Sequence, residues 1–253
     1  MARNFWSMVN QVISRADVLI EVLDARVVDE SRNLEVERKI DSKGKRLIIV
    51  INKCDLAEKE FLDRKKKELG ADCIFVSTKE HFGLTMLKKK LLECARGAEI
   101  TVGMLGYPNT GKSSVINALK GMKAAPTSSV SGYTRSIRLV RVHRNLMLID
   151  TPGVFPYGEK DETLHAMMSA KNPSQIKDPD VVAMKIIEMM ASINPSGFEK
   201  YYGQSPAGDP YEVLERLALD KKKLRTGGTP DVDLIARMII TDWQKGKIIL
   251  RKD

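Results

Sequence analysis

Three short polar motifs occur in an unusual order along the chain, and this order limits the folds that the chain can adopt. Asn52-Lys53-Cys54-Asp55 comes first, Gly106-Tyr107-Pro108-Asn109-Thr110-Gly111-Lys112-Ser113 follows, and Asp150-Thr151-Pro152-Gly153 is last. The second motif has the spacing of a phosphate-binding loop, and the first has the pattern of a loop that reads guanine. In an ordinary small GTPase the phosphate loop lies near the N-terminus and the guanine motif lies far downstream. The order here predicts one nucleotide site built from a circularly permuted sequence.

Short apolar segments alternate with amphipathic segments from residue 16 to about residue 151. Strands are expected at Ala16–Asp24, Arg46–Lys53, Cys73–Ser77, Ile100–Leu105, Arg135–His143 and Leu146–Asp150. Helices are expected near 33–41, 57–69, 85–96 and 113–120. This alternation predicts a mostly parallel sheet with helices on both faces. The last two strands are close enough to form an antiparallel hairpin at the edge of that sheet.

The strand pattern stops beyond Gly153. Helices are expected near 161–170, 179–193, 195–202, 210–221 and 231–245, and two of them follow an Asp-Pro pair. We therefore predict an α/β fold, with a circularly permuted P-loop GTPase domain over residues 1–156. A small all-α C-terminal domain is expected over residues 157–253, where it is a candidate for RNA or ribosome binding.

Composition excludes several classes of protein. The longest apolar stretches, such as Leu47–Ile51, are too short to span a bilayer, and the N-terminus lacks the apolar core of a secretory signal. The three cysteines are isolated and lack metal-ligand spacing. These features predict a cytoplasmic protein without a membrane partner; we expect a monomer.

The positive charge is concentrated in the first part of the chain. Residues 1–154 contain 27 Lys and Arg against 18 Asp and Glu, whereas residues 155–253 contain 15 of each. The basic clusters are Lys43–Arg46, Arg64–Lys67, Lys88–Lys90 and the arginines of 135–144. Each cluster alone fits a solvated helix or strand face. Together they favour a polyanionic partner such as RNA, because neutralised phosphates release counterions.

The phosphate loop follows an apolar strand and precedes a helical segment, which is the context that such a loop requires. Backbone N–H groups can close around phosphate oxygens there, and the start of the helix adds favourable dipole charge. Lys112 would reach the β- and γ-phosphates. The residues expected to contact nucleotide are Tyr107, Pro108, Asn109, Thr110, Gly111, Lys112, Ser113 and Ser114.

Three residues are candidate Mg2+ ligands. The Ser113 hydroxyl would bind the ion directly, and Asp150 can approach it from a strand end. Thr134 would complete the shell when γ-phosphate is present, with Thr127 as its competitor for that role and strand entry as its structural alternative. The backbone N–H of Gly153 can approach the γ-phosphate. Lys112, Thr134 and Gly153 are thus the candidate catalytic residues.

The guanine motif lies just past a predicted strand, where ligands bind in open α/β sheets. The Asp55 carboxylate can accept hydrogen bonds from guanine N1–H and the 2-amino group, which adenine cannot donate. Lys53 can lay its aliphatic stem over the base, and Asn52 can brace neighbouring loops. Ser77-Thr78-Lys79 follows another strand and can present a backbone N–H to guanine O6.

With these motifs the chain resembles the YlqF/YawG-like family of circularly permuted ribosome-assembly GTPases. The resemblance also rests on Asp24-Ala25-Arg26, Ser31-Arg32-Asn33 and the C-terminal residues Ala236-Arg237 and Asp242–Lys247. It covers roughly residues 8–248. Val28 and Ser131 replace prolines that are usual in the family, and neither change removes a group expected to contact nucleotide.

The resemblance implies a GTP-hydrolysing switch in large ribosomal subunit assembly, with ribosomal RNA as partner and Mg2+ as cofactor. It also implies that Asn109 helps to hold K+. Val154 stands where many GTPases have a glutamine that orients water, so intrinsic hydrolysis is expected to be slow and to be stimulated by K+ or ribosomal subunits. Two other functions stay open: a GTPase in another RNA-related process, and a GTP-dependent RNA-binding module with negligible turnover.

Overall fold

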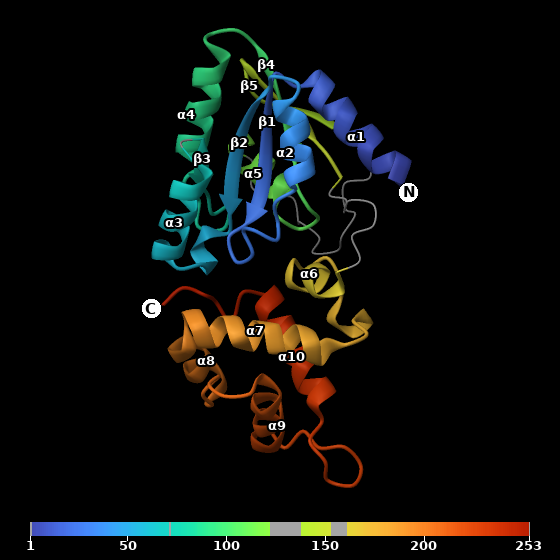
Figure 1. Ribbon diagram of the computed structural model, residues 1–253. Helices are drawn as coiled ribbons and strands as arrows, with labels where there is room; N and C mark the ends of the chain where they lie inside the picture. Colours follow the sequence, from blue (N-terminus) through green and yellow to red (C-terminus); the bar gives the residue numbers. More distant parts are fainter. Residues whose placement is uncertain (1, 71, 122–137, 153–160, 253) are drawn as a thin grey trace. The chain divides into compact units, whose positions relative to one another are not determined.

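The computed structural model describes residues 2–70, 72–121, 138–152 and 161–252, which divide into two compact units (Figure 1). The first unit comprises Met1–Asp55 and Glu60–Lys160, and the second comprises Leu56–Lys59 and Asp161–Asp253. The expected boundary between residues 156 and 157 lies outside the described residues. Within the described ranges, no helix combines the length and apolar character needed to cross a membrane.

A six-stranded sheet forms the centre of the first unit. Its strands are β1 (Val18–Asp24), β2 (Arg46–Asn52), β3 (Cys73–Phe75), β4 (Ile100–Leu105), β5 (Arg138–His143) and β6 (Leu146–Asp150). Their order in the sheet is β3-β2-β1-β4-β6-β5, and every neighbouring pair is parallel except β5 and β6. The mostly parallel sheet and its antiparallel edge hairpin are therefore confirmed.

Side chains alternate between the two faces of the central strand β1. Val18, Ile20 and Val22 face a core formed with α4 (Leu84–Ala95) and α5 (Lys112–Lys120). Leu19 faces a second core formed with α1 (Ala2–Arg15) and α2 (Leu34–Asp41). Helices thus cover both faces, as predicted (Figure 1). The first unit also contains α3 (Lys59–Leu69) from Glu60 onward, and the short 3-10 helix η1 (Cys54–Leu56) follows β2.

Helix α1 was not predicted. Its buried residues Phe5, Val9, Val12 and Ile13 recur at helical spacing, and this periodicity is the signal that the sequence offered. The helix lies close to β4 at Gly103. A Cβ atom on Gly103 would come within 2.6 Å of Val12 Cγ1, so the approach requires glycine.

The second unit is helical, as predicted. Its elements are α6 (Glu162–Met167), η2 (Pro173–Gln175), α7 (Pro179–Ile193), α8 (Pro195–Tyr202), α9 (Pro210–Asp220) and α10 (Val232–Gln244). Helices α7 and α9 begin at the prolines of the two Asp-Pro pairs, and Asp209 accepts hydrogen bonds from the N–H groups of Tyr211 and Glu212. The sequence did not predict the grouping of Leu56–Lys59 with this unit, which follows from pairings such as Leu250 N–H with the Leu56 carbonyl.

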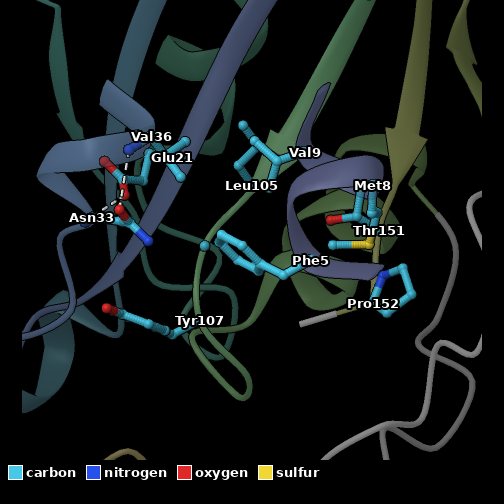
Figure 2. A pocket seen from close by; sticks show the side chains of 11 residues that line it. Phe5, Met8, Val9, Glu21, Asn33, Val36, Leu105, Tyr107, Thr151 and Pro152 are labelled. Carbon is cyan, nitrogen blue, oxygen red and sulfur yellow. Dashed lines mark hydrogen bonds between the residues drawn. The ribbon is translucent and has the colours of Figure 1, made fainter. Parts of the chain in front are cut away.

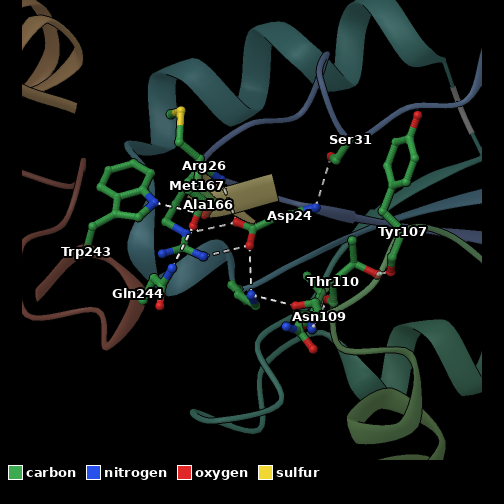
Figure 3. Close-up of polar contacts among 12 residues, drawn as sticks. Asp24, Arg26, Ser31, Tyr107, Asn109, Thr110, Ala166, Met167, Trp243 and Gln244 are labelled. Atoms are coloured by element: carbon green, nitrogen blue, oxygen red, sulfur yellow. Dashed lines mark hydrogen bonds and ion pairs between the residues drawn. The ribbon is translucent and has the colours of Figure 1, made fainter. Parts of the chain in front are cut away.

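The C-terminal signature holds the second unit together. The indole N–H of Trp243 donates to the Met167 carbonyl at 3.0 Å, and Gln244 donates to the Ala166 carbonyl at 2.8 Å (Figure 3). The buried Asp242 carboxylate accepts from the Tyr202 hydroxyl at 3.1 Å. It also forms an ion pair with the ammonium of Lys247, which belongs to the same signature. These contacts give the signature a structural role.

Candidate nucleotide-binding site

Four parallel strands bring the sequence motifs to one edge of the sheet. β1 ends at Asp24, β2 at Asn52, β4 at Leu105 and β6 at Asp150. Because carboxyl ends of parallel strands share an edge, the guanine motif, the phosphate loop and Asp150 emerge on the same side. The permuted order along the chain therefore does not separate the motifs in space.

The phosphate loop runs from β4 into α5. Gly111 has φ of 97° and precedes the helix at Lys112, and a Cβ atom on it would lie 2.1 Å from Nδ2 of Asn52. Only glycine fits this position without displacing the guanine motif. Within the loop, the Thr110 hydroxyl donates to the Tyr107 carbonyl at 3.1 Å. The backbone N–H groups at the start of a helix favour an anion.

Lys112 lies folded against its own loop. Its ammonium donates to the carbonyl oxygens of Gly106 at 2.9 Å and Tyr107 at 2.7 Å, and the residue is 5% exposed. Burial lowers the pKa of Lys112 to about 8, although the Asp150 carboxylate opposes this change. A polyphosphate bound at the loop would supply negative charge next to this ammonium and so favour its charged form.

Ser113 and Asp150 come together from α5 and the end of β6. The Ser113 hydroxyl lies 3.3 Å and 3.2 Å from the two carboxylate oxygens of Asp150. A hydroxyl and a carboxylate are hard oxygen donors of the kind that Mg2+ prefers. This pair fits the ion that the sequence predicts. Ser114 follows in the first turn of α5.

The guanine motif is bonded directly to the phosphate loop. Asn52 Nδ2 donates to the Thr110 carbonyl at 2.9 Å, and Lys53 Nζ donates to the Asn109 carbonyl at 2.8 Å. Asn109 has φ of 61° and Lys53 has φ of 60°, so both residues of the second bond have left-handed backbone. Asn52 thus braces a neighbouring loop, as the sequence analysis expected of it.

Asp55 lies in η1, and its Oδ1 is buried without a hydrogen-bond partner among the described residues. Such an orphaned acceptor costs free energy unless a ligand pairs with it. The second loop of the expected base site is a tight turn, in which Ser77 N–H and Phe82 N–H each bond the other residue's carbonyl. Thr78 is half-buried and Lys79 is exposed in that turn. Guanine supplies the donors that Asp55 would accept.

Some predicted site residues lie outside the described part of the chain. These are Thr134, its competitor Thr127, Gly153 and Val154. Their expected roles at the γ-phosphate stay predictions. Asn109, the expected K+ ligand, is described, and its carbonyl oxygen is the acceptor of the Lys53 bond.

Sequence reasoning missed a buried acid next to the phosphate loop. Glu21, on β1, is 1% exposed; its Oε1 accepts from the Asn33 N–H at 2.9 Å, and its Oε2 has no hydrogen-bond partner among the described residues. Burial and the negative charge of Glu37 raise the pKa of Glu21 well above its usual value. The residue borders a cavity of about 20 Å3, which also touches Gly106 and Tyr107 (Figure 2). That volume is about enough for one water molecule.

Comparison with known proteins agrees with these motifs. The profile of a family described as "50S ribosome-binding GTPase" matches residues 101–200, which begin with β4 and the phosphate loop and exclude Asn52–Asp55. An uncharacterized GTP-binding protein of Methanocaldococcus jannaschii is 37% identical over 95% of the chain, which spans 65% of that protein. Nucleolar GTP-binding protein 2 of Neurospora crassa is 30% identical over 98% of the chain, which spans 41% of it. The chain thus spans less than two thirds of these relatives.

Solved structures share the fold. The chain is similar to GNP-bound YlqF from T. maritima, with a TM-score of 0.65 and 23% identity over 98% of this chain and 96% of that one. The GDP-bound form of T. maritima YlqF gives a TM-score of 0.66, also at 23% identity, over 95% of each chain. The chain therefore shares the fold of these YlqF structures, and its guanine motif comes before its phosphate loop.

Proposed function

We propose that the protein binds GTP and hydrolyses it to GDP and phosphate at the edge formed by β1, β2, β4 and β6. The observation that carries this proposal is the direct bonding of the guanine motif to the phosphate loop. Asn52 and Lys53 reach loop carbonyls that are 58 and 56 residues away in the sequence. A site that recognises a base and a phosphate chain together needs this fixed spacing.

Each described residue has a role that its contacts support. Lys112 and the N–H groups around Gly111 would hold the β- and γ-phosphates. Ser113 and Asp150 would hold Mg2+, which supplies charge neutralisation at the phosphates when it is bound. Asp55 would accept from guanine N1–H and the 2-amino group, with Ser77-Thr78-Lys79 closing the other edge of the base.

The γ-phosphate end of the site completes the proposal. Thr134 would contribute its hydroxyl to the Mg2+ shell, and Gly153 its N–H to the γ-phosphate. Asn109 would help to hold K+. Val154 cannot orient a water molecule by hydrogen bonding, so we propose that turnover is slow without K+ or a ribosomal partner.

We further propose that the partner is the large ribosomal subunit, bound through its RNA. The net charge of +9 supports a polyanionic partner. So do the description of the matching family as ribosome-binding GTPases and the name of the nucleolar relative from Neurospora crassa. In the second unit, residues 221–231 form an exposed loop closed by hydrogen bonds between Arg225 N–H and the Thr229 carbonyl and between Asp231 N–H and the Lys223 carbonyl. Lys222, Lys223 and Arg225 extend from this ordered loop, where phosphates can reach them.

Nucleotide titration and phosphate release with Lys112→Ala test the proposal. We expect the wild-type protein to bind GTP with micromolar affinity or better and the variant to lose at least about a hundredfold, because one buried cation serves several phosphate charges. Circular dichroism of both proteins controls for folding. Turnover is measured in Na+ and in K+, with and without large subunits, and Asn109→Ala should remove the K+ difference. GTP binding by a folded Lys112→Ala variant at wild-type affinity contradicts the site, and binding without turnover in any condition favours the RNA-binding module.

A further inference from the structure

The Asp-Ala-Arg element lies at the end of β1, where its acid is enclosed between two cations. Asp24 is 0% exposed, and its Oδ1 accepts from the backbone N–H and the Nε of Arg26 at 3.1 Å and 3.0 Å. Its Oδ2 accepts from Arg26 Nη2 at 2.8 Å and from Lys53 Nζ at 2.7 Å (Figure 3). One carboxylate therefore fixes both an arginine of its own loop and the lysine of the guanine motif.

The backbone around Asp24 is fixed without any ligand. The Asp24 N–H donates to the Ser31 hydroxyl at 3.1 Å, and that hydroxyl donates to the Val28 carbonyl at 3.1 Å. The Ala25 N–H donates to the Asn52 carbonyl at 2.9 Å. The Ser-Arg-Asn element thus closes the loop that follows β1. As a result, the carboxylate has a defined position before nucleotide arrives.

Lys53 depends on this carboxylate for its charge and its position. Burial lowers the pKa of Lys53, the Asp24 carboxylate raises it, and the Arg26 guanidinium lowers it again. Burial by itself would raise the pKa of Asp24, but the two cations hold it well below its usual range. Removing the carboxylate would leave two like charges close together in a buried setting, which is costly.

We propose that Asp24 is a positioning residue that acts on the nucleotide through Lys53. The proposal rests on the function proposed above. Asp24 holds the Lys53 ammonium where it can also donate to the Asn109 carbonyl, so a single side chain joins the base loop to the phosphate loop. The aliphatic stem of Lys53 is then fixed over the base position, and Asp55 follows two residues later. Arg26 balances the charge of the carboxylate.

A double-mutant cycle tests this proposal by titration of fluorescent GDP. Asp24→Asn and Lys53→Met should each weaken GDP binding about tenfold, because an unpaired member of a buried charge pair no longer holds its geometry. In the Lys53→Met background, Asp24→Asn should change the affinity by less than about twofold. In turnover assays Asp24→Asn should raise KM for GTP more than it lowers kcat.

Asp17→Asn is the matched control, because Asp17 precedes the opposite end of β1 and accepts from the Thr101 N–H at 2.8 Å. It should bind GDP like the wild type. Additive losses in the double variant, or wild-type affinity in Asp24→Asn, overturn the proposal. If Asp24→Asn alone does not fold, the comparison of Lys53→Met with the double variant decides, and a threefold or greater further loss overturns it. No GDP binding by the wild-type protein instead rejects the nucleotide site itself.

Discussion

Glu21 and Asp24 lie three residues apart on the same buried strand, yet their carboxyl groups have opposite protonation behaviour. Asp24 faces Arg26 and Lys53, which keep it ionised. Glu21 is buried near another acid, Glu37, and its Oε1 accepts a hydrogen bond from the backbone N–H of Asn33. The charged groups next to a buried acid therefore decide whether it is ionised, and burial sets the free-energy cost of its ionised form.

Glu21→Gln should stabilise the first unit at neutral and alkaline pH. The pKa of Glu21 is raised in the folded chain. Its contribution to the free energy of unfolding is therefore fully present below pH 4.5, which is its pKa in the unfolded chain. That stability is lost as pH rises from there through the folded pKa, because unfolding then releases a proton. Glutamine keeps an acceptor for Asn33 and does not titrate.

Urea unfolding at pH 4 and pH 8 measures the effect. The gain in unfolding free energy relative to wild type should be larger at pH 8 by about 1–3 kcal/mol. Glu35→Gln, the same change at an exposed position of α2, should show no such difference. An equal effect of Glu21→Gln at both pH values would show that folding does not raise the pKa of Glu21.

At the scale of elements, the packing of α1 against β4 depends on the absence of a side chain at Gly103. A Cβ atom on Gly103 would lie 2.6 Å from Val12 Cγ1, 2.8 Å from Leu19 Cδ1 and 3.0 Å from the Ala16 Cβ. The three atoms belong to buried side chains of α1, of the residue just after α1, and of β1. They cannot relax independently, because they share one core.

Gly103→Ala should therefore destabilise the protein by about 1–3 kcal/mol, as overpacked cores do. Thermal and urea unfolding followed by circular dichroism provide the measurement. Thr101→Ala, two residues earlier on β4, is the matched control and should cost less. A variant as stable as the wild type would mean that α1 does not pack against β4 at this distance.

Much of the arrangement of elements could be predicted from the sequence. The strands β1, β2, β4 and β6 have nearly continuous apolar runs, and the phosphate loop marks the start of α5. Helix α1 was missed because it precedes the first strand and so lies outside the alternation of strands and helices. The pairing of Leu250 with Leu56 was missed because backbone contacts between distant segments leave no local pattern.

The candidate site, too, could be predicted from the sequence only in part. Ser113, Asp150 and the guanine motif are local patterns, and the structure brings them to one sheet edge. The bond between Asp24 and Lys53 spans 29 residues, and the one between Glu21 and Asn33 spans 12. These partners become visible only when strand order and side-chain direction are known.

At the scale of the whole molecule, the order of the motifs places the expected γ-phosphate motif directly before the segment that leads to the second unit. Residues 154–160 follow the expected γ-phosphate motif in the sequence and lead directly to Asp161, where the second unit resumes. In an unpermuted GTPase this segment returns to the same sheet. We infer that a change at Gly153 acts on the connection between the units.

Binding to large ribosomal subunits should therefore depend on the nucleotide. With a non-hydrolysable GTP analogue we expect affinity at least about fivefold higher than with GDP, a coupling typical of such switches. Co-sedimentation at fixed salt measures it, because phosphate contacts are ionic. Replacing Lys222, Lys223 and Arg225 with alanine should weaken both states. Equal affinity with the two nucleotides would reject the coupling and leave the nucleotide site untouched.

The central claim is that a permuted chain assembles one guanine-nucleotide site, and a change of base specificity tests it most directly. Oδ1 of Asp55 is buried without a partner among the described residues, and guanine has the donors to meet it. Xanthine replaces the 2-amino donor with a carbonyl acceptor, which an asparagine amide can pair with. In calorimetric competition, the wild-type protein should prefer GDP over XDP and ADP by at least about a hundredfold. Asp55→Asn should prefer XDP over GDP, whereas an unchanged base preference in that variant would contradict the account.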